Sequence, residues 1–134
     1  AEDLPYIISD VLNRRSIHEK IKIKSYYLKH KKNEKPSADV KIEIEGKTYS
    51  EKGTGDGQFD AFMNAVKKLY KKNGYSLPIL TDYSVTIPPG SHSDALCETF
   101  ITWKNSEKEF VTRGLDSDQT VSAIKATEKM LNII

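Results

Sequence analysis

The residues of this chain that are best suited to binding chemistry lie near its middle, in KGTGDGQFDAF at residues 52–62. Gly53, Gly55 and Gly57 alternate with small polar residues and lead into a helical pattern. A glycine-rich turn that opens a helix often holds a phosphate on its backbone N–H groups. However, Gly57 is not followed by Lys and Ser/Thr, which excludes a Walker loop, and no parallel βαβ pattern surrounds the turn, which excludes a dinucleotide fingerprint. The turn therefore needs another interpretation.

A second segment, RGLDSDQT at residues 113–120, occupies the same place before a second helical pattern. We call residues 53–60 the first corner and residues 114–119 the second corner. In a pair of such units the two helix starts could meet in one crevice. Their free N–H groups would favour an anion, and the nearby carboxylates would favour an ammonium group. A crevice with both preferences would suit a free amino acid. The alternative is that the aspartates cap and charge the first helical turns. The residues leave both interpretations open for Asp56, Asp60, Asp116 and Asp118.

An internal repeat determines where the corners lie. When the chain is aligned with itself, Ile23 falls on Leu80 and Tyr26 falls on Tyr83. Further along, Gly53 falls on Gly114 once a longer hairpin is allowed in the second half. Because turn residues match as well as apolar ones, the pattern indicates a repeat. It predicts an α+β fold of two pseudo-symmetric βββα units that pack about a local two-fold axis, preceded by a short helix.

Hydrophobic periodicity predicts the elements of each unit. In the first unit we expect strands at residues 20–28, 39–45 and 47–51 and a helix from Gln58 to Lys72, ended by Asn73-Gly74. In the second unit we expect strands at residues 81–87, 95–103 and 108–113 and a helix at residues 119–132. Upstream, DLPYIISDVLNR predicts a separate short helix, with Asp3 as its cap and Pro5 in its first turn.

The composition indicates one globular domain without a membrane span. Of 134 residues, 37% are hydrophobic and 30% are charged, and the net charge of +2 gives little support for a nucleic-acid partner. The apolar runs are shorter than a membrane span and no signal peptide is recognisable, so we expect no membrane partner and a cytoplasmic location. Because the chain begins at Ala1 without a methionine, we expect it to be part of a longer protein.

Residue types needed for catalysis are not grouped by their spacing. His18, His30 and His92 fall on different predicted elements without metal-ligand spacing, which is typical of surface histidines. Cys97 is the one cysteine, which excludes an internal disulfide, and its inward strand position suits a small apolar residue. We therefore expect no catalytic residue, no metal and no cofactor in this chain.

Three longer stretches resemble a known family. They are GDGQFDAFMNAVKKL at residues 55–69, LTDYSVTIPPGSHSDALCETFITW at 80–103 and TRGLDSDQTVSAIKATEKMLN at 112–132. They are similar to the C-terminal regulatory domain of the α-isopropylmalate synthase family, which includes isopropylmalate, citramalate and homocitrate synthases. The helix with Leu4-Pro5-Tyr6 resembles the tail of the linker that joins the catalytic barrel to this domain. The resemblance implies a linker tail at residues 1–18 and an amino-acid-binding domain at 19–134, with units at about 19–74 and 78–134.

The resemblance implies a dimeric effector-binding module, which is itself non-catalytic, from an acetyl-CoA-dependent acyltransferase. In isopropylmalate synthases the effector is usually leucine, which inhibits the condensation of acetyl-CoA with 2-oxoisovalerate. In citramalate synthases the effector is isoleucine and the oxo acid is pyruvate. A divalent metal and acetyl-CoA would be bound by the catalytic barrel, whose residues this chain lacks. Leucine and isoleucine differ in the position of one methyl group, so the sequence leaves this choice open.

The resemblance also implies an effector site built from three groups of residues. The first corner contributes Gly55, Asp56, Gly57, Phe59 and Asp60; two strands of the second unit contribute Leu80, Tyr83, Ile87, Ser93 and Cys97; the second corner contributes Leu115, Ser117 and Gln119. The family often has Pro-Val or Pro-Leu in place of Gln58-Phe59, so the larger Phe59 is expected to narrow the pocket. Leu80, Tyr83 and Ile87 do not share one strict alternation, so we expect a bulge or bend before Pro88 to bring them together. Ordinary core packing is the alternative for Leu80 and Ile87.

A different class of function is also compatible with the order of the elements. A short helix, three strands and a helix form a double-stranded-RNA-binding domain, in which the basic run Lys29–Lys35 would reach a groove. Against this, the following helix begins Gln-Phe-Asp where phosphate contact would favour lysine, and the second unit has no comparable basic loop. We therefore expect a free branched-chain amino acid as the partner and no nucleic acid.

Overall fold

The structure of the chain, a computed structural model, describes residues 20–87 and 96–134. The described residues form two compact units, which we call the N-terminal unit (residues 20–77) and the C-terminal unit (residues 78–134). The short helix predicted in residues 1–18 lies outside the described residues. Among the described residues, no helix has both the length and the apolar character needed to cross a membrane.

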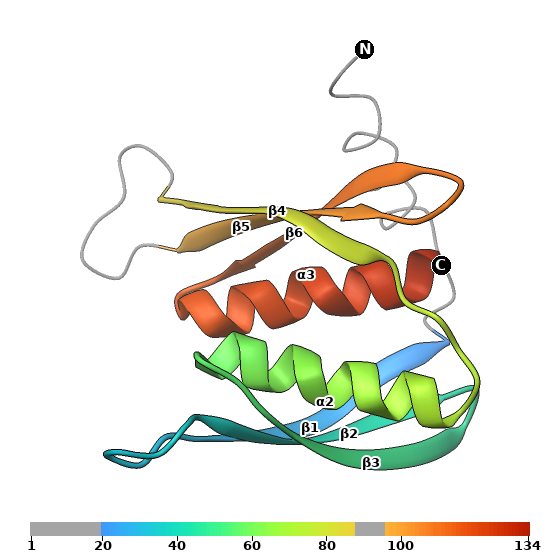
Figure 1. Cartoon of the computed structure of the whole chain (residues 1–134). Helices are drawn as coiled ribbons and strands as arrows, with labels where there is room; N and C mark the ends of the chain where they lie inside the picture. The colour runs from blue at the N-terminus through green and yellow to red at the C-terminus, as the bar shows by residue number, and fades with distance from the viewer. Residues whose placement is uncertain (1–19, 88–95) are drawn as a thin grey trace. The chain divides into compact units, whose positions relative to one another are not determined.

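The N-terminal unit is a three-stranded antiparallel sheet with one helix across a face of it (Figure 1). Its elements are β1 (Ile21–Lys29), β2 (Ser37–Ile44), β3 (Lys47–Thr54) and α2 (Gln58–Lys72), and the strand order is β1-β2-β3. Glu45 and Gly46 join β2 to β3 with φ values of 50° and 85°, the left-handed conformation that a tight hairpin requires. Helix α2 ends at Asn73 and Gly74, as predicted.

The C-terminal unit repeats this architecture (Figure 1). Its elements are β4 (Ile79–Thr86), β5 (Cys97–Lys104), β6 (Glu109–Asp116) and α3 (Gln119–Ile133), and the strand order is β4-β5-β6. Both sheets are antiparallel throughout. The predicted α+β fold of two βββα units is therefore confirmed, whereas their packing about a local two-fold axis stays a prediction.

The repeat extends to an irregularity in the first strand of each unit. The register of β1 against β2 shifts between Ile23 and Ser25, and that of β4 against β5 shifts between Leu80 and Asp82. Leu80 is the counterpart of Ile23 in the repeat, so the two irregularities fall at matching positions. The sequence predicts a bulge or bend before Pro88, and the register shift places a bulge at Thr81, well before that proline.

Gly53 and Gly114 lie inside strands, because β3 and β6 continue past the ends predicted at residues 51 and 113. A Cβ atom on Gly53 would lie 2.6 Å from the carbonyl oxygen of Ala61 in α2. A Cβ atom on Gly114 would lie 2.8 Å from the backbone nitrogen of Ala126 in α3 and would overlap the carbonyl oxygen of Ser122. These two glycines therefore allow each helix to pack directly on the last strand of its sheet.

The cores of the two units differ in polarity. Strand β2 contributes only apolar side chains to the core of the N-terminal unit: Ala38, Val40, Ile42 and Ile44. Among its described residues, the C-terminal unit instead buries four hydroxyl side chains: Thr99, Thr112, Ser122 and Thr127. Each of these has a hydrogen-bond partner, as buried polar groups require. One partner is Trp103, which is fully buried and donates from Nε1 to Thr112 Oγ1 at 2.9 Å. Because Trp103 is the one tryptophan of the chain, its fluorescence reports on the C-terminal unit.

Candidate functional site

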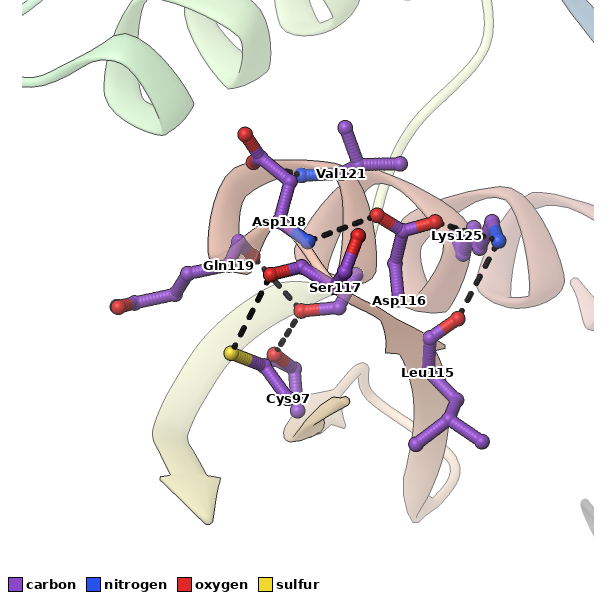
Figure 2. Close-up of polar contacts among 10 residues, drawn as sticks. Cys97, Leu115, Asp116, Ser117, Asp118, Gln119, Val121 and Lys125 are labelled. Atoms are coloured by element: carbon purple, nitrogen blue, oxygen red, sulfur yellow. Dashed lines mark hydrogen bonds and ion pairs between the residues drawn. The ribbon is translucent and has the colours of Figure 1, made fainter. Parts of the chain in front are cut away.

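The second corner connects β6 to α3, and its carboxylates are hydrogen-bonded to its own backbone (Figure 2). Asp118 is the N-cap residue of α3, and its Oδ1 accepts a hydrogen bond from the Val121 N–H at 3.0 Å. Asp116 Oδ2 accepts a hydrogen bond from the Asp118 N–H at 2.8 Å. At this corner the two aspartates therefore stabilise the turn and the first turn of the helix, which is the capping interpretation of the sequence.

Lys125 reaches from α3 back to the end of β6 (Figure 2). Its Nζ lies 3.0 Å from Asp116 Oδ1 and donates to the Leu115 carbonyl oxygen at 3.2 Å. The hydrogen bond from the Asp118 N–H, followed by that from the Lys125 ammonium, lowers the pKa of Asp116 below its usual value, although partial desolvation acts in the opposite direction. The folded corner therefore favours the carboxylate form of Asp116.

The lowered pKa of Asp116 predicts a loss of stability in acid. A carboxyl whose folded pKa lies below its unfolded pKa stabilises the fold fully above the unfolded value, about 3.9 for aspartate, and loses this contribution as the pH falls through the folded value. Asp116→Asn should therefore lower the free energy of unfolding at about pH 7, and the difference from wild type should shrink below about pH 4. Urea denaturation followed by Trp103 fluorescence at several pH values measures this. A difference that is the same at every pH would contradict the prediction.

The cap at Asp118 predicts a change in stability of moderate size. Asp118→Ala removes the acceptor for the Val121 N–H, so the free energy of unfolding should fall by about 1 kcal/mol. Asp118→Asn keeps a side-chain oxygen and should retain most of the stability. Chemical denaturation followed by Trp103 fluorescence distinguishes the two variants. Equal stability of Asp118→Ala and wild type would exclude a capping function for this residue.

The first corner has the same shape but different residues. Gly57 is the N-cap residue of α2, with φ −134°, and helix α2 has no side-chain cap. Gly55 takes the place of Asp116, and its N–H donates to the Pro36 carbonyl oxygen at 3.1 Å. A Cβ atom on Gly55 would lie 2.6 Å from the Ala61 nitrogen, so the chain packs closely against the helix start. The second corner has capping carboxylates, whereas at the first corner no side chain caps the start of α2.

Two carboxylates, those of Asp56 and Asp60, nevertheless lie near this uncapped helix start. Asp60 lies in the first turn of α2, where a negative charge interacts favourably with the helix dipole. Asp56 Oδ1 lies 3.8 Å from Lys35 Nζ, and because both side chains are strongly exposed this pair contributes little to stability. The first corner thus combines a helix N-terminus without a side-chain cap and two nearby carboxylates, which is the combination that would suit a zwitterion.

Phe59 takes part in a cluster of aromatic rings within the N-terminal unit. Its ring stacks on Phe62 at a centroid distance of 6.1 Å, and Phe62 meets Tyr26 edge-to-face at 6.2 Å. Phe62 is fully buried, and Tyr26 is the counterpart of Tyr83 in the repeat. Such ring pairs stabilise one side-chain arrangement. That Phe59 narrows an effector pocket stays a prediction.

The bulge at Thr81 places two of the predicted strand residues on one face of the second sheet. Leu80 pairs with Trp103 and Tyr83 pairs with Ile101. Paired residues of an antiparallel sheet point to the same face, and Trp103 and Ile101 are both fully buried. Leu80 and Ile87 nevertheless remain 36% and 64% exposed, which argues against ordinary core packing as the explanation for them.

Four of the predicted site residues gather at the second corner: Cys97, Leu115, Ser117 and Gln119 (Figure 2). Cys97 Sγ donates to the Ser117 carbonyl oxygen at 3.9 Å. Ser93 lies outside the described residues. The first corner belongs to the other unit, so its approach to this group stays a prediction. In residues 20–87 and 96–134, no group of three or more His, Cys, Asp or Glu could hold a metal ion.

Sequence reasoning missed the residues that hold the second corner in place. Lys125 bonds to Leu115 and Asp116, and Ser122 Oγ donates to the Gln119 carbonyl oxygen at 2.7 Å while it also contacts the Thr99 hydroxyl at 2.5 Å. The repeat carries a signal that could have found Lys125. The alignment that places Gly53 on Gly114 also places Asn64 on Lys125, and Asn64 Nδ2 donates to the Thr54 carbonyl oxygen at 2.6 Å. The same contact from helix to strand end thus recurs in both units.

Comparison with known proteins gives one family match and several similar sequences. The sequence model of the LeuA allosteric (dimerisation) domain matches residues 1–134. Over 98% of its length the chain is 28% identical to the 2-isopropylmalate synthase of Methylorubrum populi and 29% identical to that of Aquifex aeolicus. It is also 28% identical, over 98% of its length, to a putative (R)-citramalate synthase of Archaeoglobus fulgidus. The chain spans about a quarter of the length of these relatives, 24%, 24% and 26% respectively.

Proposed function

The chain belongs to the LeuA allosteric (dimerisation) domain family, and on this premise we propose that it is the feedback-regulatory part of a 2-isopropylmalate synthase. It binds leucine and thereby inhibits the condensation of acetyl-CoA with 2-oxoisovalerate. The observation that carries this proposal is the family match over residues 1–134. Among the curated relatives, the names of the Methylorubrum populi and Aquifex aeolicus proteins support it.

The geometry of the first corner supports a specific mode of binding. The carboxylate of the amino acid would accept hydrogen bonds from the N–H groups at the start of α2, where Gly57 offers no side chain of its own. The ammonium group would lie beside Asp60 or Asp56, and the side chain would point toward Leu80, Tyr83 and Ile87. Bonds between ionised groups and backbone N–H groups are stronger than neutral ones, so the zwitterion would provide affinity and the apolar residues would provide selectivity.

An alternative effector is isoleucine, with the chain as part of a citramalate synthase that uses pyruvate. The similarity to the putative citramalate synthase of Archaeoglobus fulgidus supports this alternative at the same identity of 28%. In either case the parent protein would be a cytoplasmic acyltransferase in branched-chain amino acid biosynthesis, with a divalent metal and acetyl-CoA bound in its catalytic barrel. Residues 1–18 would be the tail of the linker from that barrel, and residues 19–134 the regulatory domain. The family match favours both alternatives over an RNA-binding function.

Isothermal titration calorimetry of the 134-residue chain with leucine, isoleucine, valine and lysine tests the proposal. We expect one of the branched-chain amino acids to bind most tightly and lysine not to bind. Two analogues of leucine serve as matched controls, because leucinamide lacks the carboxylate and 4-methylpentanoate lacks the ammonium group. Both should bind far more weakly than leucine if the site recognises a zwitterion. Failure of all four amino acids to bind would overturn the proposed function.

We also propose that the chain forms a homodimer, as the description of its family suggests. In the part of the C-terminal unit that the structure describes, four large apolar side chains are between 44% and 70% exposed: Ile79, Ile87, Leu96 and Ile134. Apolar surface of this kind is commonly covered by a partner subunit. Sedimentation equilibrium at micromolar concentration should give about twice the mass of 15.2 kDa. A single species at the monomer mass would contradict this prediction.

A further inference from the structure

One partly exposed ion pair connects helix α3 with the second corner. Lys125 Nζ lies 3.0 Å from Asp116 Oδ1, and the two side chains are 51% and 25% exposed. Exposed pairs of this kind contribute little to the stability of a fold. The pair is nevertheless part of a longer chain of contacts (Figure 2). Its main effect is therefore on the backbone of the second corner, which those contacts hold in place.

The contacts run from the helix through the corner and back to the helix. Asp116 uses one carboxylate oxygen for Lys125 and the other for the Asp118 N–H at 2.8 Å, and Asp118 in turn accepts from the Val121 N–H at 3.0 Å. Lys125 also donates to the Leu115 carbonyl oxygen at 3.2 Å. The backbone from Leu115 to Asp118 is thereby fixed at both ends and in its middle. We call the contact between Asp116 and Lys125 the corner clamp.

The N-terminal unit shows which part of this arrangement the fold itself requires. There Asn64 occupies the place of Lys125 and makes the matching contact to the strand end, from Nδ2 to the Thr54 carbonyl oxygen at 2.6 Å. Gly55 occupies the place of Asp116, so the carboxylate that would complete a clamp is missing. A βββα unit of this type therefore folds without a carboxylate at the position of Asp116. The corner clamp is an addition to the second corner.

We propose that Asp116 and Lys125 are positioning residues of the effector site, which hold Leu115, Ser117 and Gln119 in the conformation that binds the amino acid. This inference rests on the proposed function, because it assigns a task to residues beside the proposed site. The physical basis is preorganisation: a corner that is already fixed before binding loses less conformational freedom when the ligand arrives. The first corner, built on glycine, contributes backbone groups without such a clamp.

Lys125→Asn tests the clamp with little change to the helix-to-strand contact, because it copies the residue that makes this contact in the N-terminal unit. Asp116→Asn removes the carboxylate charge from the other side. Each variant should weaken leucine binding by about fivefold to tenfold in calorimetry at a temperature where it is fully folded. The midpoint of thermal unfolding should change little in Lys125→Asn, and it should fall modestly in Asp116→Asn, which also loses the carboxylate that accepts from the Asp118 N–H. The double variant should bind no more weakly than the weaker single variant, since both changes break one interaction.

Two controls separate positioning from a general effect of charge or folding. Lys125→Arg keeps a cation within reach of Asp116 and should retain most of the affinity. Lys72→Met removes a lysine in the last turn of α2 that also pairs with a strand carboxylate, that of Glu51 at 2.7 Å, at the helix end opposite the first corner, and it should bind leucine as wild type does. Hydrogen exchange of the Asp118 N–H should become faster in Asp116→Asn, with or without ligand, because the acceptor of this N–H is weakened.

The possible results distinguish this inference from the function on which it rests. If wild type binds none of the amino acids tested, the proposed function is wrong and the inference is overturned with it. If wild type binds leucine or isoleucine and Lys125→Asn and Asp116→Asn bind it equally well, only the inference is overturned. Equal loss of affinity in Lys72→Met would also overturn it, because the effect would then be one of overall charge.

Discussion

Replacing Gly114 with alanine is expected to lower the free energy of unfolding of the C-terminal unit by about 3 kcal/mol or more. The added methyl group would overlap the carbonyl oxygen of Ser122 and lie 2.8 Å from the backbone nitrogen of Ala126. Both atoms belong to the backbone of α3, which cannot move aside as a flexible side chain could. The helix would have to shift away from β6, and the buried contacts beneath it would be lost. Urea denaturation followed by Trp103 fluorescence measures this change in the unit that is affected.

Two further glycine substitutions serve as matched comparisons. Gly53→Ala should have a large effect in the N-terminal unit, since the new Cβ atom would lie 2.6 Å from the Ala61 carbonyl oxygen. Gly57→Ala places its Cβ atom 3.7 Å from Asp60 Oδ2, an ordinary contact, at a φ of −134° that alanine readily adopts. It should cost at most about 1 kcal/mol, because alanine is a poorer N-cap than glycine. If Gly114→Ala and Gly57→Ala are equally stable, close packing of β6 against α3 is not the reason for Gly114.

Substituting Asp60 with alanine is expected to weaken amino-acid binding by about tenfold or more, which corresponds to about 1.4 kcal/mol. The reason is that the ammonium group would lose its carboxylate partner beside the start of α2. Folding should change little, because a carboxylate in the first turn contributes only about 0.3–1 kcal/mol to its helix. Asp39→Ala removes an exposed carboxylate from β2 of the same unit and is the control for the loss of one negative charge. Calorimetric titration with leucine and isoleucine compares the three proteins.

The same titration tests which residue selects the effector. Tyr83→Ala should change the ranking of leucine against isoleucine, because Tyr83 would contact the apolar side chain and not the charged groups. In the parent enzyme, Asp60→Ala and Tyr83→Ala should shift the inhibition curve and leave uninhibited turnover largely intact. If Asp60→Ala binds leucine and isoleucine as wild type does, or if it abolishes turnover, the first corner is not the effector site.

Local periodicity determined the two βββα units and the bounds of α2. Residues 39–45 alternate between apolar and charged side chains, and this alternation needs only the period of a strand to place Val40, Ile42 and Ile44 in the core. Helix α2 lies at Gln58–Lys72, as predicted, because Gly57 precedes its apolar period and Asn73-Gly74 ends it. The internal repeat was also visible in the sequence, since finding it requires only a comparison of the chain with itself. The family resemblance then identified the candidate site residues.

Only the tertiary structure decided how the corners are held. The predicted strands ended before Gly53 and Gly114, whereas β3 and β6 continue through these glycines. The helix that crosses each strand requires a glycine there, but in the sequence such a glycine looks like a turn residue. The bulge at Thr81 depends on pairing with β5, and the contacts of Lys125 depend on the helix folding back over the strand that precedes it. The hydrogen bond from the Val121 N–H to Asp118 identifies this aspartate as the N-cap of α3. Each of these features depends on atoms that meet only after the chain has folded, whereas residue spacing reports only on the period of a single element.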